Sequence, residues 1–353
     1  MADCSDLAFK SFCDLANFVK HTEKVEFVVA ILALLMNIPH LFILTRTSMR
    51  THSTNSLMIG ISIADLISLF MMINNRAQLY WLSPNTCFNS YTYPLNVARF
   101  VQDVSWESMM RVSFYLGLCL ALIRCIIMKM SGNAPDILST TRNGYFLTLF
   151  FIFVNTLISC FYYYGFRVIK YKEPWTPGVN CTGFPAKYRE PYFYRAPKKN
   201  QLFTSERYEI FTGCSDILIA ALYPIFGLLL MLEVLKSAKV AATMLSKKDA
   251  VERYHTSRMI LVMTIFYIFA SFPTGAYKIV NFFFYESWRK DGYFYVVFTY
   301  TGKIFTSLFC GNALSHCLIN LSMSRNYRNA VMELGCCPKR KAEVTMDSKS
   351  VNS

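Results

Sequence analysis

Charged side chains stand inside long apolar segments of this chain, where they could recognise a charged molecule. Glu107 and Arg111 are four residues apart, which places them on one face of a helix and allows an ion pair. In a helix bundle within a membrane, such charges face the interior and bind a ligand or pair with one another. Both interpretations stay open for the charged set, which is Arg76, Asp103, Glu107, Arg111, Asp216, Lys278 and Lys303.

Arg124 stands alone in the run LCLALIRCIIM, which covers residues 118–128. At the centre of a bilayer an arginine costs at least ~2.5 kcal/mol, so a solitary one needs a physical reason. Near the end of a membrane-spanning helix, the guanidinium reaches water while its carbon chain stays in the apolar layer. The sequence therefore predicts a functional contact near the membrane surface, and a buried structural ion pair is the alternative.

Residues typical of catalysis form no recognisable pattern. The five histidines are scattered, with no HExxH motif, and the acids form no paired-carboxylate motif. The sequence therefore indicates that the chain is not an enzyme, and it predicts no cofactor.

The apolar residues gather in segments of about 20 residues, near the length that crosses ~30 Å of hydrocarbon. The chain is 54% hydrophobic and 16% charged, whereas a soluble domain carries about a quarter charged residues. Most segments also lack the polar face of a soluble helix. These features predict an all-α membrane protein with a seven-transmembrane helix bundle over residues 25–321. The spans are expected at about 25–45, 57–76, 104–128, 144–164, 213–235, 258–284 and 294–321.

The formal net charge of +14 could indicate nucleic-acid binding, but the basic residues of the short loops fall on one side of the bundle. Cytoplasmic loops are the basic ones, so that side should face the cytoplasm. Residues 1–24 are then extracellular, and residues 322–353 are a cytoplasmic segment that follows the chain's membrane part. The long loop 165–208 is also basic, but the charge of a long loop has less effect on whether it is translocated across the membrane. We expect a multi-pass protein of the plasma membrane without a nucleic-acid partner.

Cys87 and Cys181 lie in two different loops on the predicted extracellular side, where disulfides form, and they are the best candidate pair. Asn180 begins the sequon Asn-Cys-Thr and is a candidate for glycosylation. Cys336 and Cys337 follow the last span and precede a basic run, which is typical of palmitoylation. Ordinary tail thiols are the alternative for this last pair.

Several segments of the chain together resemble a known receptor family. They are LTRTSMRTHSTNSLMIGISIADL, SFYLGLCLALIRCIIMK, YPIFGLLLMLEVLKSAK, ASFPTGAYKIV and NALSHCLINLSMSRNYR. From about residue 25 to 330 the chain is similar to the class-W serpentine receptors of nematodes, a chemoreceptor-like family related to FMRFamide-type peptide receptors. The resemblance implies a rhodopsin-like G-protein-coupled receptor with a short amphipathic helix eight.

The resemblance also implies a hydrated polar cluster inside the spans. Asn37, Asp65, Ser113 and Asn312 match its positions. Asp65 could bind Na⁺ there or hold a hydrogen-bonded helix contact, and both interpretations stay open. No other metal is expected.

The resemblance also implies that Arg124 and His316 take part in coupling to a G protein. The chain departs from the usual receptor pattern here, because Ile123 precedes Arg124 and Cys125 follows it. No neighbouring acid can therefore hold the arginine in the ion pair that is typical of rhodopsin-like receptors.

The predicted function is that of a G-protein-coupled receptor for an extracellular ligand, with a FMRFamide-like neuropeptide as the first ligand class. Its partners would be the ligand, a heterotrimeric G protein, arrestin and the lipid bilayer. The first alternative is a chemosensory receptor for a small molecule. A seven-helix channel or transporter is the second, but the chain shows no internal repeat of the transporter kind.

Overall fold

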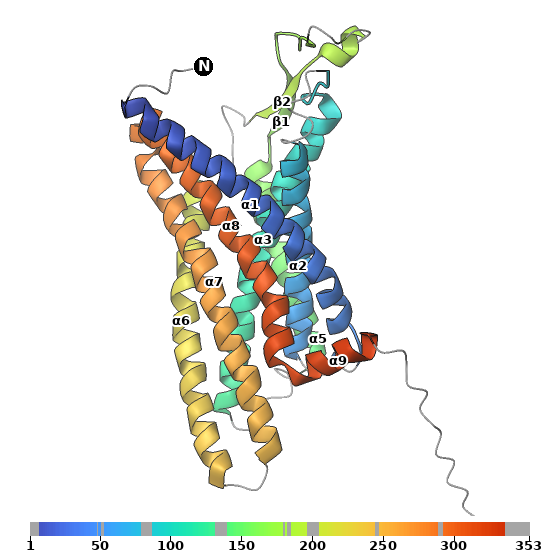
Figure 1. The fold of residues 1–353 in the computed structure, drawn as a ribbon, viewed down its shortest axis with the longest axis vertical. Helices are drawn as coiled ribbons and strands as arrows, with labels where there is room; N and C mark the ends of the chain where they lie inside the picture. The colour runs from blue at the N-terminus through green and yellow to red at the C-terminus, as the bar shows by residue number, and fades with distance from the viewer. Residues whose placement is uncertain are drawn as a thin grey trace, which may run out of the picture.

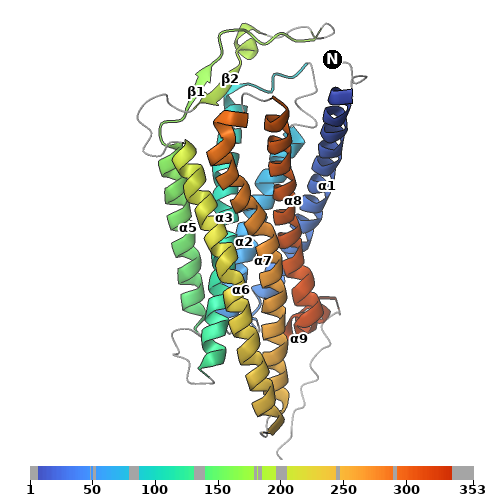
Figure 2. The same ribbon diagram turned by 90° about the vertical axis from the view of Figure 1, so that its left-hand side faces the viewer.

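Seven helices of the described chain are long and apolar enough to cross a membrane. In this computed structural model they lie side by side in one bundle (Figures 1 and 2). The structure describes residues 7–47, 49–50, 53–78, 87–130, 140–178, 181, 185–195, 205–243, 247–288 and 292–335. The prediction of an all-α seven-transmembrane bundle is confirmed.

The long helices extend beyond the predicted apolar spans, because helix formation continues where the hydrocarbon layer ends. Helix α1 begins at Leu7 within the segment expected as an extracellular tail, and α6 and α7 continue past the apolar core at their shared end. The seven helices are α1 (Leu7–Leu44), α2 (Ser53–Ala77), α3 (Tyr93–Lys129), α5 (Thr141–Tyr163), α6 (Ser205–Thr243), α7 (Lys247–Trp288) and α8 (Gly292–Met323).

The two ends of the bundle carry different small elements. Strands β1 (Arg167–Lys170) and β2 (Tyr192–Arg195) form an antiparallel hairpin at one end, with the short 3-10 helix η2 (Ala186–Arg189) between them. Helix α9 (Arg325–Gly335) crosses the opposite end (Figure 1). We call these the hairpin end and the α9 end.

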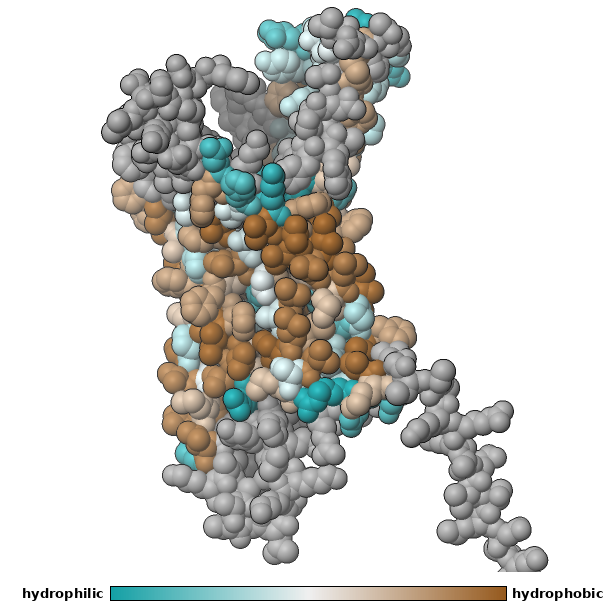
Figure 3. Space-filling model, viewed as in Figure 1, coloured by the Kyte–Doolittle hydropathy of each residue, from teal (hydrophilic) through white to brown (hydrophobic). Residues whose placement is uncertain are grey.

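The outer surface of the bundle is apolar where lipid would surround it. On α5, Phe146, Leu149 and Phe153 are each 66% exposed. Figure 3 shows hydrophobic side chains spread over the middle of the bundle, with hydrophilic ones gathered toward its ends. In water such a surface would be a large exposed apolar patch. In a bilayer the same side chains contact the hydrocarbon chains of the lipids.

Close approach of α3 to α6 and α7 depends on Gly117. A Cβ atom at this position would lie 2.4 Å from the hydroxyl of Tyr223 and 2.5 Å from Cζ of Tyr267. The two tyrosine rings stack with centroids 5.0 Å apart, and Tyr223 donates a 2.8 Å hydrogen bond to the carbonyl of Phe114. The glycine thus makes room for the aromatic core of the bundle.

Helix α9 is the short amphipathic helix that the sequence predicted after the last span. Its Tyr327 is 1% exposed and packs beneath the bundle, whereas Met332 on the same helix is 59% exposed. The Tyr327 hydroxyl lies 2.9 Å from Nδ1 of His40 on α1. Burial of this phenol raises the pKa of Tyr327. Helix α9 is therefore fastened to α1 by a buried polar contact.

A disulfide between Cys87 and Cys181 joins the segment before α3 to the loop that carries the hairpin. The sequence prediction of this pair agrees with the structure. Backbone contacts reinforce the link, because Tyr192 N–H donates to the carbonyl of Tyr91 at 2.7 Å. Asn89 also donates a 2.7 Å bond from its side chain to the carbonyl of Tyr188. The hairpin is therefore held over the end of α3.

We predict that the Cys87→Ser/Cys181→Ser double variant will lose a disulfide that is intact in the wild-type protein. Maleimide-polyethylene glycol labelling in denaturant should add two labels to the wild type on prior reduction and add none to the variant. Cys160→Ser, which removes an exposed thiol of α5, is the control and should keep the reduction-dependent gain. Equal labelling of the wild type with and without reduction would contradict the bond.

Candidate ligand site and signalling residues

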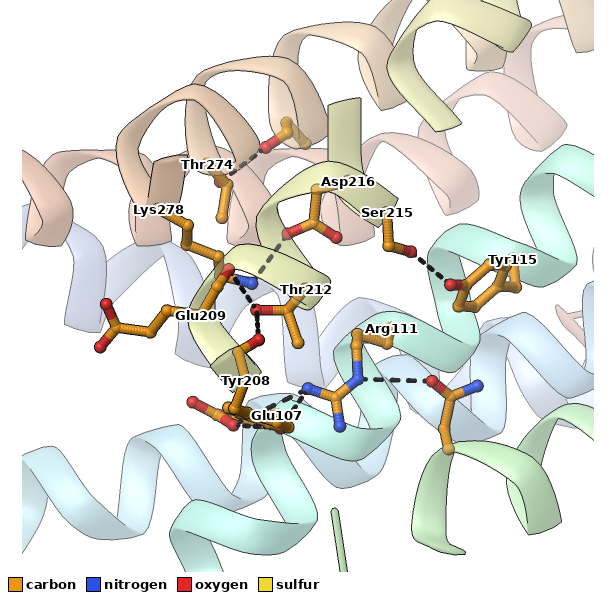
Figure 4. A network of polar contacts seen from close by, with 12 residues as sticks. Glu107, Arg111, Tyr115, Tyr208, Glu209, Thr212, Ser215, Asp216, Thr274 and Lys278 are labelled. Atoms are coloured by element: carbon orange, nitrogen blue, oxygen red, sulfur yellow. Dashed lines mark hydrogen bonds and ion pairs between the residues drawn. The ribbon is translucent and has the colours of Figure 1, made fainter. Parts of the chain in front are cut away.

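Arg111 is the centre of a buried hydrogen-bond network that joins α3, α5 and α6 near the hairpin end. Its Nε donates to Asn155 at 3.3 Å, and its other two nitrogens donate to Tyr208 at 2.6 Å and to Ser159 at 2.5 Å. Glu107 lies 3.7 Å away at the four-residue spacing that predicted an ion pair. Figure 4 shows the guanidinium beside Glu107 and Tyr208. Every nitrogen of Arg111 therefore has a protein partner.

Tyr208 completes the network, because its hydroxyl accepts from Arg111 and donates to Glu107 at 2.8 Å. Its ring stacks on Tyr162 of α5 with centroids 3.8 Å apart. A buried charge is stable only when it is paired and hydrogen-bonded. The network meets that condition, so Arg111 acts here as a link between helices.

A second ion pair joins α6 to α7. Lys278 Nζ lies 2.7 Å from Oδ2 of Asp216, whose side chain is 1% exposed (Figure 4). Gly275 permits this approach, since a Cβ there would lie 2.9 Å from the backbone nitrogen of Ile217. Close to the pair, Asn281 donates to Glu209 at 2.7 Å. Asp216 and Lys278, both predicted as ligand residues, are thus brought together.

Arg76 and Asp103, also predicted as ligand residues, line a cavity between α1, α2, α3 and α8. We call it the outer cavity; it contains about 430 Å³ of empty space, part of it open to the outside. Arg76 is held by two carboxylates of α1, at 3.4 Å from Glu23 and 2.9 Å from Glu26. The complete lining is Glu26, Met71, Met72, Asn75, Arg76, Gln102, Asp103, Trp106 and Thr306.

Asp103 connects the outer cavity to the hairpin. Its Oδ2 accepts a short hydrogen bond from the hydroxyl of Tyr194 on β2. Burial, followed by the hydrogen bond to this carboxylate, raises the pKa of Tyr194, so the phenol stays neutral and a donor. A molecule that binds Asp103 would therefore act on the hairpin as well.

Glu23, Glu26, Gln102 and Trp106 are the lining or rim residues that the sequence analysis did not select. A signal for Glu26 existed, because an acid stands at the start of the apolar run VEFVVAILALLM and Arg76 ends the next apolar segment. Gln102 directly precedes Asp103 and Trp106 follows it by about one turn, but spacing alone does not say which face meets a cavity.

The polar cluster near the middle of the bundle is built around Asp65 of α2. His316 of α8 lies 2.9 Å from Asp65 through its Nδ1, and both side chains are buried. Asn37 of α1 donates to the carbonyl of Ala313 at 3.0 Å. His316 was predicted beside Arg124 as a G-protein contact; the structure instead places it with Asp65, shielded by the bundle.

The residues around Asp65 fit a hard cation such as Na⁺, which prefers oxygen ligands. Oδ1 of Asp65, Oγ of Ser68 and Oδ1 of Asn312 are buried without a hydrogen-bond partner in the described chain, and Ser113 of α3 is fully buried. These oxygens would hold the ion, with the carboxylate supplying the charge. The His316 contact occupies the other oxygen of Asp65.

Arg124 lies toward the α9 end of α3, about 20 Å along the helix from Arg111 at 1.5 Å per residue. Its Nε is buried without a hydrogen-bond partner. Within the described ranges no carboxylate lies within ion-pair distance of it, as the flanking Ile123 and Cys125 led us to expect. The structure thus gives Arg124 no structural ion pair.

Some predicted residues lie outside what the structure describes. Asn180, Cys336 and Cys337 fall outside the described ranges, and the side chain of Lys303 is not described within α8. Glycosylation at Asn180 and palmitoylation at Cys336 and Cys337 stay predictions.

The decisive comparison is with a family model. Residues 24–338 match the model of the serpentine type 7TM GPCR chemoreceptor Srw. The chain belongs to this family. The match covers α9 and the bundle from residue 24 onward, so the resemblance to class-W serpentine receptors is confirmed, and the receptor is a multi-pass membrane protein. A search of curated proteins found no significant match.

We predict that Tyr208→Phe will destabilise the receptor. The substitution removes the oxygen shared by Arg111 and Glu107 and leaves a buried donor of the guanidinium unpaired, which costs about 1–3 kcal/mol. The thermal unfolding midpoint of purified receptor in detergent should fall by several degrees. Tyr164→Phe is the control, because Tyr164 is 66% exposed and should change the midpoint little. Equal midpoints for Tyr208→Phe and wild type would show that the network adds no stability.

Proposed function

We propose that this receptor detects a small water-soluble molecule in the outer cavity and signals through a heterotrimeric G protein at the α9 end. The cavity is the observation that carries the proposal. Its empty space, about 430 Å³ with the open solvent at its mouth included, has room only for a small ligand. Its lining combines two methionines with charged and amide side chains, which suits a polar molecule with an apolar part.

A peptide ligand, including a FMRFamide-like neuropeptide, is the second candidate. The hairpin favours it, because Arg167 and Lys170 of β1 pair with a strand, β2, that carries Tyr192, Phe193 and Tyr194. The ion pairs of Arg111 and Lys278 count against it, since both cations are already held by protein partners. The small-molecule proposal therefore has the stronger physical support, and membership of a receptor family opposes a channel or transporter.

The proposed orientation puts the hairpin end outside the cell and the α9 end in the cytoplasm. The basic residues of the short loops support it, because cytoplasmic loops carry the excess of Lys and Arg. The disulfide between Cys87 and Cys181 at the hairpin end agrees, since disulfides form in oxidising compartments. A G protein, and arrestin after it, would then meet the α9 end.

We predict that an epitope tag before Met1 will be stained on intact cells, whereas a tag after Ser353 will be stained only after permeabilisation. The charge asymmetry of the loops is the physical reason. A receptor with both tags compares the two ends within one population of cells. An N-terminal tag visible only in permeabilised cells would overturn the orientation and the proposed function with it.

We predict that Arg124→Ala will abolish signalling and preserve surface expression. Among the described residues no carboxylate pairs with Arg124 and its Nε has no hydrogen-bond partner, so its removal should not unfold the bundle. The test is a screen of small polar molecules and peptides on transfected cells, read by calcium and cyclic AMP, followed by the variant with each active compound. Lys129→Ala removes a neighbouring positive charge as a matched control and should signal. Full agonist-driven signalling by Arg124→Ala, or its retention inside the cell, would contradict the role.

A further inference from the structure

The outer cavity contains two buried hydrogen-bonding groups that none of the described residues satisfies. Oε1 of Gln102 is an acceptor without a partner, and the indole N–H of Trp106 is a donor without a partner. Gln102 is 5% exposed, and both side chains line the cavity. A buried polar group left unpaired is costly, whereas a bound molecule with complementary groups would remove that cost.

The charges of the lining indicate which complementary groups such a molecule carries. Arg76 is already held by two carboxylates, so it has little positive charge to offer an anion. Asp103 accepts a hydrogen bond from Tyr194, a neutral phenol. The cation one turn away, Arg99, donates to Gln78 at 3.1 Å and lies over the ring of Tyr91. Within the described ranges no cation lies at ion-pair distance from Asp103, and a carboxylate in that position attracts a positive ligand.

We propose, resting on the proposed function, that the outer cavity selects a small organic cation: a protonated amine that also carries a hydrogen-bond acceptor. The ammonium group donates to Asp103 and to Oε1 of Gln102. The acceptor receives the indole N–H of Trp106. Met71 and Met72 supply an adaptable apolar wall for the carbon skeleton.

The cavity also explains why one small cation could change the receptor. Its walls come from four helices, and Asp103 holds the hairpin through Tyr194. An ammonium at Asp103 competes with or strengthens that hydrogen bond, and so alters the contact between α3 and β2. The recognition chemistry and the responsive contact therefore lie on the same carboxylate.

The test measures the charge preference of the cavity without knowledge of the natural ligand. Asn75→Cys places a thiol in the lining, and Tyr93→Cys places one at an exposed position at the start of α3. Each is made in a full-length receptor in which Cys4 and Cys13 are serine. Intact cells are treated with methanethiosulfonates of similar size that carry either a trimethylammonium or a sulfonate group. The rate of thiol modification by the cationic reagent is divided by the rate for the anionic reagent in each variant. The ratio for Asn75→Cys is then divided by the ratio for Tyr93→Cys.

We expect this normalised ratio to be about tenfold in favour of the cationic reagent, the effect of one nearby charge at the dielectric of a protein surface. Asp103→Asn should lower it several-fold, leaving the smaller preference that Glu23 and Glu26 retain against the single charge of Arg76. Asp103→Glu should restore the full ratio, which separates charge from a folding defect. A ratio near or below one in the unaltered cavity would overturn the proposal. So would an unchanged ratio in Asp103→Asn.

A signalling arm separates this inference from the proposed function. Among matched amine, alcohol and carboxylate analogues of small molecules, only amines should activate the receptor. Trp106→Phe and Gln102→Leu should each raise the half-maximal concentration about tenfold, whereas Tyr93→Phe should not. Activation by carboxylates would overturn the inference and leave the receptor function standing. A cation preference in labelling without a response to any compound would support the inference and count against the proposed signalling function.

Discussion

A charge buried in a helix bundle must be paired, and in this receptor that requirement falls first on Arg111. Its side chain is 3% exposed and its nitrogens bond to residues of α5 and α6. Water cannot replace these partners in the apolar layer, so α3, α5 and α6 can separate only by exposing an unpaired guanidinium. The network therefore fixes the position of α3, which carries Asp103 and Trp106 at one end and Arg124 at the other.

The same requirement divides the buried polar and charged residues into two groups. Arg111 with Glu107, and Lys278 with Asp216, satisfy one another and hold helices together. Asp103, Gln102 and Trp106 keep hydrogen-bonding capacity that the protein does not use fully. The paired residues of the first group fix the rotation of α3. The second group therefore stays on the side of α3 that faces the outer cavity. Structural pairs thus create the rigid frame in which unsatisfied groups are available for recognition.

Much of the fold could be predicted from the sequence, because apolar length and loop charge are local signals. The seven spans followed from them, and the pair of Glu107 and Arg111 followed from helical spacing alone. The amphipathic α9 was implied by the resemblance to a receptor family. The pairing of Arg76 with Glu26 could not be predicted, since it depends on how far apart α1 and α2 lie. Likewise, the sequence placed His316 among signalling residues, whereas the rotation of α8 about its axis directs the ring toward Asp65. Rotation and separation of helices are properties of packing, and no single segment encodes them.

Packing also gives the two ends of the receptor a continuous physical connection. Tyr267 stacks on Tyr223 and lies 5.1 Å, centroid to centroid, from the ring of His316, which holds Asp65. Tyr223 bonds to the carbonyl of Phe114, on the stretch of α3 between Trp106 and Arg124. Gly117 leaves no spare room there, so α3 cannot shift against α6 and α7 without repacking both tyrosines. Close-packed interiors move between discrete arrangements and do not deform continuously. A small change of α3 at the outer cavity would therefore reach the α9 end as a change of packing state at this aromatic core.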